Sequence, residues 1–172
     1  LSRVLQLVEA ILRRTAYMVL LLENPGARTQ LVKLCSESPW IARQLAETPL
    51  LLDELLNAES LYSPPARDEL QDDLRQQTLR ISYDDLENQM ESLRHFKKAH
   101  TLRVAASELK GTLPLMKVSD YLTWMAEAIL QQVLVLLAQL EDRERVAGER
   151  REEMGAERVR LQEEITTLGT EE

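Results

Sequence analysis

Residues 93–130, with the sequence LRHFKKAHTLRVAASELKGTLPLMKVSDYLTWMAEAIL, decide the fold of this chain. Their first part carries apolar side chains at steps of three and four residues, which is typical of an α-helix with a buried face. Gly111 fits the left-handed residue that commonly ends a helix, and Pro114 follows it closely. The stretch therefore predicts two long helices joined by a turn at residues 111–114, the second of them apolar almost all round.

The apolar pattern also predicts which side chains each long helix buries. The main stripe of the first helix is Leu86, Met90, Leu93, Phe96, His100 and Val104, and its second face is Ala105, Ala106 and Leu109. We expect Ser119 to cap the second helix. The predicted buried face of that helix is Leu122, Met125, Ala126, Ile129, Val133, Leu136 and Leu140.

A series of shorter helices precedes this pair. An amphipathic helix is expected to end near Asn24, and three later starts are predicted where a hydrogen-bond acceptor stands just before a proline, at Asn24-Pro25, Ser38-Pro39 and Thr48-Pro49. Trp40 has the spacing of a core residue, residues 57–69 read as a loop, and residues 68–79 as a charged surface helix. Ser82, with Asp85 three residues on, resembles the start of the long helix.

The predicted fold is all-α: a helical bundle of short, proline-started helices packed on two long helices, with a charged C-terminal tail. We expect a helical domain at residues 1–140, divided into a short-helix regulatory or connector part (1–64) and a long-helix part (65–140). Residues 141–172 then form a charged tail, interpreted as a frayed or solvated helix. Met154, Leu161 and Leu168 recur at heptad spacing within it, which leaves dimerisation through the tail as an alternative.

Composition excludes several functions. A formal net charge of -8 repels polyanions at long range, so no nucleic-acid partner is expected. The single Cys35 has no internal partner for a disulfide, and it predicts a buried thiol in a reducing, cytoplasmic setting. The uninterrupted apolar runs at residues 18–22 and 133–138 are far shorter than the ~20 residues that span a bilayer, so neither a transmembrane segment nor a membrane partner is expected.

No complete active site is visible in the residues. His95 and His100 are five positions apart, which places them about 140° apart on a helix and disfavours a shared zinc site. Residues 111–119, GTLPLMKVS, lack the second glycine and the adjacent lysine-serine pair of a phosphate loop. There is also no Asp-x-Asp pair to hold magnesium. We therefore predict no catalytic, cofactor-binding or metal-binding residue.

One local basic cluster stands out in this acidic chain. It comprises Arg94, Lys97, Lys98 and Arg103, and Lys117 follows in the turn region. Such a cluster suits an acidic partner or a phosphate-bearing substrate, and these five residues are the candidate partner or interdomain contacts. The alternative is an ordinary solvated face that pairs with Glu91 and Glu108.

Two stretches of the sequence carry a family resemblance. LENPGARTQLVKLCSESPWIARQLAETPLLLDELL at residues 22–56, together with residues 93–130, closely resembles bacterial glutamine synthetase adenylyltransferases. The strings LCSESPW, PLLLDELL and LPLMKVSDYLTW, in this order, make the resemblance specific, and it extends from residue 1 to about residue 139. It implies the central helical segment that precedes the second nucleotidyltransferase domain of these bifunctional enzymes.

The resemblance implies a parent reaction in which AMP passes from ATP to a tyrosine of glutamine synthetase, with magnesium. The other half of such an enzyme removes the group with phosphate, and PII signalling protein and glutamine set the balance. Where this family continues into a strand, a glycine-rich turn and an Asp-x-Asp motif, the present chain continues into residues 141–172. We therefore expect a non-catalytic helical fragment that contacts a nucleotidyltransferase domain; the alternative is a free-standing helical protein interaction module.

Overall fold

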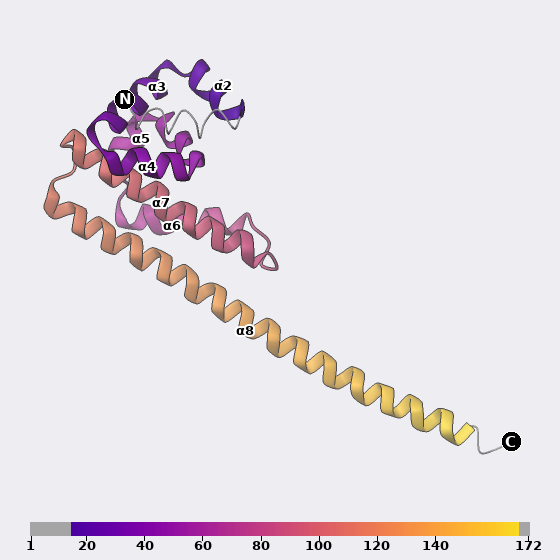
Figure 1. Cartoon of the computed structure of the whole chain (residues 1–172). Coiled ribbons are helices and arrows are strands. Elements are labelled where there is room, and N and C mark those ends of the chain that lie inside the picture. The colour runs from indigo at the N-terminus through magenta and orange to yellow at the C-terminus, as the bar shows by residue number, and fades with distance from the viewer. Residues whose placement is uncertain (1–14, 169–172) are drawn as a thin grey trace. The chain divides into compact units, whose positions relative to one another are not determined.

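The structure, a computed structural model, describes residues 15–168, and they form helices with no β-strand among them (Figure 1). This confirms the all-α prediction. By their internal contacts, the residues divide into two units, Leu1–Leu130 and Gln131–Glu172. The structure describes the predicted first amphipathic helix from Thr15 to Glu23, and the part of the prediction before Thr15 lies outside the described residues.

The short helices begin where the prolines predicted. They are α2 (Thr15–Glu23), α3 (Pro25–Glu37), α4 (Pro39–Glu47), the 3-10 helix η1 (Pro49–Leu55) and α5 (Ala58–Tyr62). At the three proline starts, the capping hydrogen bond forms only at Ser38, whose hydroxyl accepts from the Ile41 amide at 3.3 Å. Asn24 instead turns its side-chain amide back to the Leu20 carbonyl, at 2.8 Å. Proline at the first position thus marks these starts more consistently than the cap does.

The loop predicted at residues 57–69 is wrong in its first part, because α5 forms there. The side-chain oxygen of Asn57 accepts hydrogen bonds from the amides of Glu59 and Ser60, at 3.0 and 3.2 Å. Leu61 is then fully buried. The cap and the burial of Leu61 and Tyr62 fix this five-residue helix, which is too short to show periodicity in the sequence.

Three longer helices follow: α6 (Arg67–Leu79), α7 (Leu86–Lys110) and α8 (Leu115–Leu168). The predicted turn between the last two is confirmed. Gly111 has a φ of 73°, and its amide donates to the Glu108 carbonyl at 2.9 Å. The amide of Thr112 donates to the Ser107 carbonyl, also at 2.9 Å, which closes the end of α7.

Both predicted caps of the long helices are wrong by a few residues. Asp85 caps α7, where its carboxylate accepts from the Asn88 amide at 3.1 Å. The Ser82 hydroxyl instead accepts from the Asp84 amide in the preceding turn. Helix α8 begins at Leu115, directly after Pro114, so Ser119 lies inside the helix. The restricted backbone of Pro114 starts that helix, and its carbonyl accepts from the Lys117 amide at 2.8 Å.

The core of the first unit forms where the short helices meet the C-terminal half of α7 (Figure 1). Leu34, Ile41, Leu45 and the leucines of η1 and α5 pack there with Ala99, Leu102 and Ala106 of α7. Cys35 is 1% exposed in this cluster, and burial raises the pKa of its thiol to about 11. Trp40 does not join them: it is 39% exposed, so its predicted core role is wrong.

The buried faces of the long helices differ from prediction at particular positions. On α7, Leu93, Phe96, His100 and Val104 are buried as predicted, but Leu86 and Met90 are 43% and 39% exposed. Gln89 is buried beside them, and its side-chain amide donates to the carbonyls of Thr78 and Ile81, each at 3.1 Å. It thereby satisfies carbonyls at the end of α6, which a leucine cannot do.

In the first unit, α8 buries Tyr121, Met125 and Ala128. Leu122 and Ala126 are exposed, so the predicted face is rotated by about one residue. Tyr121 is the residue that sets this rotation, because its hydroxyl has a partner in the core that an apolar pattern does not reveal. That partner is His100 of α7, whose Nδ1 is 2.7 Å from the hydroxyl.

In the second unit, α8 continues to Leu168, and residues 141–162 are exposed throughout. The tail predicted at residues 141–172 is therefore a solvated helix over residues 141–162. Within Leu115–Gln162, one 18-residue window has a mean hydropathy of 1.4 and is 22% buried, which by length and composition alone is enough to cross a membrane. Counting only uninterrupted apolar runs missed this window. The core helix of a soluble protein meets the same criterion, but such a helix is mostly buried, whereas this window is 22% buried.

Candidate functional site

Three of the five candidate contact residues line one shallow pocket between α4 and α7. Arg94, Lys97 and Lys98 lie on α7 together with Thr101, and Trp40 and Gln44 face them from α4; the pocket has a volume of about 300 Å³. Spacings of three and four residues bring these α7 side chains onto one helix face. We call this the Trp40 pocket.

The cations of the Trp40 pocket are only partly compensated. Arg94 pairs with Glu91 at 3.2 Å, and both side chains are mostly exposed. Lys98 donates to the Thr48 hydroxyl at 2.8 Å, which leaves its charge unpaired. Lys97 has no side-chain partner among residues 15–162. The pocket therefore carries a local excess of positive charge in a chain whose net charge is -8.

The other two candidates lie elsewhere. Arg103 is nine residues after Arg94, which at about 100° per residue is the opposite side of the helix. It pairs with Glu54 of η1 at 2.6 Å, and the two side chains are only 20% and 12% exposed. Lys117 pairs with Asp120 at 3.5 Å near the start of α8, where both are exposed. Of the alternative pairings with Glu91 and Glu108, the structure contains the one between Arg94 and Glu91.

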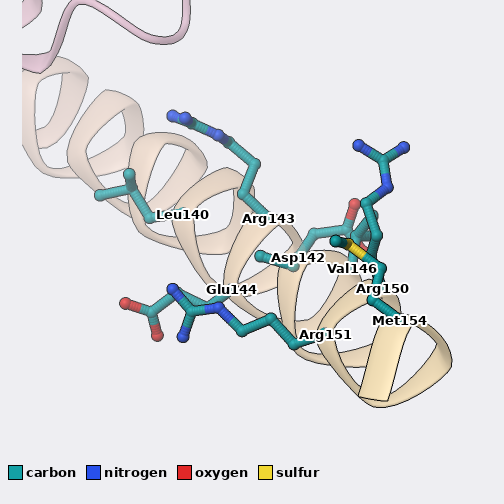
Figure 2. A pocket seen from close by; sticks show the side chains of 9 residues that line it. Leu140, Asp142, Arg143, Glu144, Val146, Arg150, Arg151 and Met154 are labelled. Atoms are coloured by element: carbon teal, nitrogen blue, oxygen red, sulfur yellow. The ribbon is translucent and has the colours of Figure 1, made fainter. Parts of the chain in front are cut away.

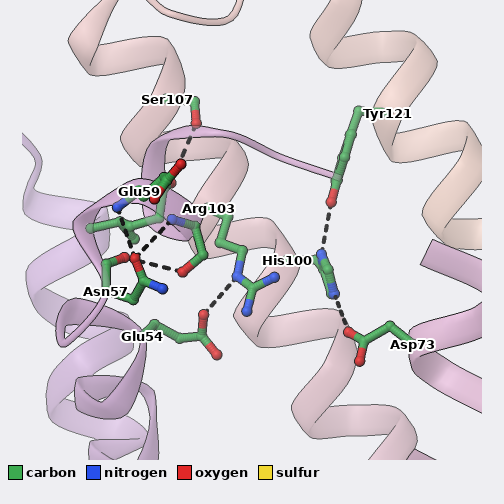
Figure 3. Close-up of polar contacts among 10 residues, drawn as sticks. Glu54, Asn57, Glu59, Asp73, His100, Arg103, Ser107 and Tyr121 are labelled. Carbon is green, nitrogen blue, oxygen red and sulfur yellow. Dashed lines mark hydrogen bonds and ion pairs between the residues drawn. The ribbon is translucent and has the colours of Figure 1, made fainter. Parts of the chain in front are cut away.

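A polar network, which the sequence did not reveal, is centred on the buried His100 of α7 (Figure 3). His100 Nδ1 is 2.7 Å from the Tyr121 hydroxyl of α8, and its Nε2 is 3.6 Å from an Asp73 carboxylate oxygen of α6. The Phe96 ring packs on the imidazole, with 4.2 Å between ring centroids. The network thus joins α6, α7 and the first turns of α8.

The pKa shifts follow from this burial. His100 is 1% exposed, and desolvation lowers the pKa of its imidazole despite the nearby Asp73. Its contact with His100 in turn lowers the pKa of the Asp73 carboxyl. Burial raises the pKa of Tyr121 above its ordinary value. A neutral imidazole fits both contacts when Nε2 carries the hydrogen towards Asp73 and Nδ1 accepts from the tyrosine hydroxyl.

The order of carboxylate, imidazole and hydroxyl in Asp73, His100 and Tyr121 resembles that of a catalytic triad. Here, however, His100 and Tyr121 are 1% and 2% exposed, and the tyrosine hydroxyl already has its partner. A nucleophile must reach its substrate, so this arrangement is suited to joining helices rather than to attacking a bound molecule. The sequence placed His100 on the buried stripe, and its unmet hydrogen-bonding need was the one available signal.

A separate hollow of about 670 Å³ lies in the second unit (Figure 2). All of its lining residues belong to α8: Leu140, Asp142, Arg143, Glu144, Val146, Ala147, Arg150, Arg151 and Met154. It is therefore bounded by a single helix and consists of the spaces between long charged side chains. We do not treat it as a ligand site.

Comparison with known proteins agrees with the resemblance stated above. The sequence model of the family described as glutamate-ammonia ligase adenylyltransferase matches residues 28–160. The chain is similar to proteins named bifunctional glutamine synthetase adenylyltransferase/adenylyl-removing enzyme. It is 68% identical to the one from Pseudomonas putida and 65% identical to that from Pseudomonas aeruginosa, each over 79% of this chain, and 52% identical to that from Shewanella frigidimarina over 77%. The chain spans 14% of the length of each of these relatives.

Proposed function

The chain belongs to the glutamate-ammonia ligase adenylyltransferase family, and we propose that its helices serve such an enzyme as a non-catalytic connector beside a nucleotidyltransferase domain. In this proposal the whole enzyme transfers AMP from ATP, with Mg²⁺, to a tyrosine of glutamine synthetase, and removes it again. PII signalling protein and glutamine would regulate that balance, in the cytoplasm. The residues described here would hold the catalytic machinery in place and contribute no reacting group.

The proposal rests on the positions of the histidine, tyrosine and charged side chains that could take part in catalysis. His100 contacts Tyr121 in the core and, with its other ring nitrogen, an Asp73 carboxylate that is 44% exposed, and Arg103 and Glu54 form a mostly buried pair beside them. Each contact joins different helices of the first unit. Groups used in this way stabilise a scaffold, and a scaffold that fixes the relative positions of its helices is what a connector between catalytic domains requires.

Two exposed surfaces are the proposed contacts with the neighbouring domain. One is the Trp40 pocket with Arg94, Lys97 and Lys98. The other is the first turn of α8, where Leu115 and Met116 are 75% and 83% exposed and Lys117 follows. Large apolar side chains this exposed on adjacent positions are costly in water and are typical of interaction surfaces.

The proposal is tested by two measurements of AMP transfer. The purified chain, incubated with glutamine synthetase, Mg²⁺ and radiolabelled ATP, should incorporate no label; incorporation would refute the non-catalytic role. In a full-length enzyme of this family that carries the same residues, Lys97→Glu with Lys98→Glu should weaken AMP transfer or its response to PII. An unchanged rate and response would exclude this surface as a contact.

The alternative is a free-standing helical interaction module, and it is favoured by the exposed apolar residues of α8. Leu130 and Leu134 are 63% and 66% exposed. If the chain acts as such a module through this face, sedimentation should show concentration-dependent self-association that Leu134→Glu abolishes. If the chain is instead a connector, Leu134→Glu in the full-length enzyme should leave the rate of AMP transfer unchanged.

A further inference from the structure

We propose that the Trp40 pocket is a docking site for an acidic peptide segment of a partner protein, in which carboxylates flank one aromatic or large apolar side chain. The inference deepens the proposed function, because it names the chemistry of the partner that this basic surface would receive. It rests on the way two helices are brought together, on the charge of their side chains, and on an aromatic residue left uncovered between them.

The pocket is built by packing, so it exists before any partner arrives. Ile41 and Leu45 of α4 are fully buried in the core that also contains Ala99 and Leu102 of α7. Trp40 stands next to Ile41 but remains 39% exposed, on the outer edge of the same contact. The 2.8 Å hydrogen bond from Lys98 to Thr48 further ties α7 to the end of α4. A preformed site loses less conformational entropy on binding than a mobile one.

The charges favour carboxylates. Arg94, Lys97 and Lys98 are spread along about one turn of α7, and Glu91 is the only carboxylate that pairs with any of them among residues 15–162. Several carboxylates in a flexible segment can meet several cations spaced in this way. The net charge of -8 acts against a long polyanion, but screening limits that repulsion to about 8–10 Å, so a short acidic segment can still bind locally.

The aromatic wall distinguishes a peptide from a bare anion. Inorganic phosphate gains nothing from an indole ring, whereas an aromatic or apolar side chain between the acidic residues can pack on Trp40 and bury it. Tryptophan and arginine are also the residue types that contribute most to binding at protein interfaces. Gln44 and Thr101 complete the lining and offer polar groups to the peptide backbone.

Binding is measured on the whole 172-residue chain by fluorescence anisotropy. The probe is a fluorescein-labelled peptide in which glutamates flank one phenylalanine. Lys97→Glu with Lys98→Glu should weaken binding at least tenfold. The matched control is Lys33→Glu with Arg75→Glu, which changes the net charge equally at exposed positions outside the pocket and should change the affinity less than twofold. Equal losses in both double variants would reduce the effect to net charge and overturn the proposal.

The role of Trp40 is tested by a second peptide, with alanine in place of the phenylalanine. Trp40→Ala should weaken binding of the phenylalanine peptide about two- to tenfold, the range expected of an aromatic pair. The same variant should hardly affect the alanine peptide, and Trp40→Phe should restore most of the loss. Circular dichroism checks that each variant folds. If Trp40→Ala weakens both peptides equally, the ring is not an anchor and the proposal fails.

Direct contact is visible in the fluorescence of Trp40 itself. The chain has two tryptophans, so Trp124→Phe leaves Trp40 as the only one, and its emission should shift when unlabelled peptide is added. Displacement of the labelled peptide by inorganic phosphate, but not by chloride at equal ionic strength, would reassign the pocket to a small anion and overturn the proposal. None of these measurements involves AMP transfer. A chain that transferred AMP would therefore refute the proposed function without affecting this inference.

Discussion

At the scale of single residues, the first unit depends on polar groups that are satisfied by other helices. His100 lies in the core because Tyr121 and Asp73 occupy its two ring nitrogens, and Gln89 is buried because it binds the end of α6. Arg103 and Glu54 add a mostly buried ion pair between α7 and η1. Leaving a buried polar group without a hydrogen-bond partner costs more free energy than the hydrogen bond itself contributes. Removal of one partner from any of these contacts should therefore destabilise the fold.

Tyr121→Phe should therefore lower the free energy of unfolding by about 1–3 kcal/mol, because it leaves Nδ1 of His100 buried without its partner. Urea unfolding followed by circular dichroism measures the change. Tyr17→Phe is the control, since Tyr17 is only half-buried and its hydroxyl has no described partner. Equal stability of the two variants would show that the hydrogen bond contributes nothing.

The stability of the fold should also depend on pH through His100. The groups that face it are Asp73 on α6, Arg103 on α7, Glu54 on η1 and Tyr121 on α8. Burial lowers its pKa below 6.5, so the unfolded chain binds a proton at a pH where the folded chain does not. The free energy of unfolding should thus fall as the pH decreases from 6.5 through the lowered pKa.

Urea unfolding at several pH values, with His100→Gln for comparison, tests this dependence. The variant should lose most of the slope just below pH 6.5. A second loss of stability is expected only in more acidic solution, below 3.8, because the pKa of Asp73 is also lowered. An identical slope in wild type and variant would assign the proton uptake to other groups.

At the scale of elements, the sequence predicted helix starts and stops better than it predicted which side of a helix faces the core. Prolines 25, 39 and 49, and Gly111, act through their own backbone geometry, so their effect is local and visible in sequence. The rotation of α8 depends on Tyr121 reaching His100, which is 21 residues earlier in the chain. A hydrogen bond of that range cannot be read from apolar spacing.

The candidate site shows the same limit. The sequence identified the cations of the basic cluster, and helical spacing alone groups Arg94, Lys97 and Lys98 on one face. Arg103, counted in the same cluster, instead pairs with Glu54 on the opposite side of α7. The helical spacing of Trp40 beside Ile41 predicts a core role, but Trp40 is 39% exposed. Only the packing of α4 on α7 shows that the indole instead borders the pocket. The sequence shows the types of residue that line the pocket, but only the tertiary structure shows that Trp40 of α4 lies beside the cations of α7.

Two glycines provide a test of local backbone geometry. Gly111 has a φ of 73°, so Gly111→Ala should destabilise the first unit by roughly 1 kcal/mol although no atom lies within 4 Å of an added Cβ. Gly148 lies within α8 and also has no atom within 4 Å, so Gly148→Ala should instead favour the helix by up to about 1 kcal/mol. Thermal unfolding by circular dichroism measures both; a change of the same sign in both variants would contradict this reasoning.

At the scale of the whole molecule, the two units differ in how they are stabilised. The first has a hydrophobic core and a buried polar network. In the second, residues 141–162 are exposed, and ion pairs such as those of Arg145 with Asp142 and Glu149, both at 2.6 Å, lie on the helix surface. Surface pairs of this kind are screened by water and salt, so each contributes much less to stability than a buried leucine.

A chain shortened to residues 1–140 should therefore unfold at nearly the same urea concentration as the full chain. Its ellipticity at 222 nm should fall roughly in proportion to the helical residues that are removed. Sedimentation of the two forms would show whether the removed residues also carry self-association. A large drop in the unfolding midpoint would mean that the exposed helix stabilises the core.

The single cysteine provides a chemical probe for opening of the core. Alkylating reagents attack the thiolate, and Cys35 is both 1% exposed and, with a pKa of about 11, almost entirely protonated near neutrality. Iodoacetamide should modify it only when the helices separate, so the labelling rate under native conditions, divided by the rate for the unfolded chain, gives the population of the open state when closing is faster than alkylation. Mass spectrometry of one site would then report the free energy of core opening, without denaturant and without any knowledge of a partner.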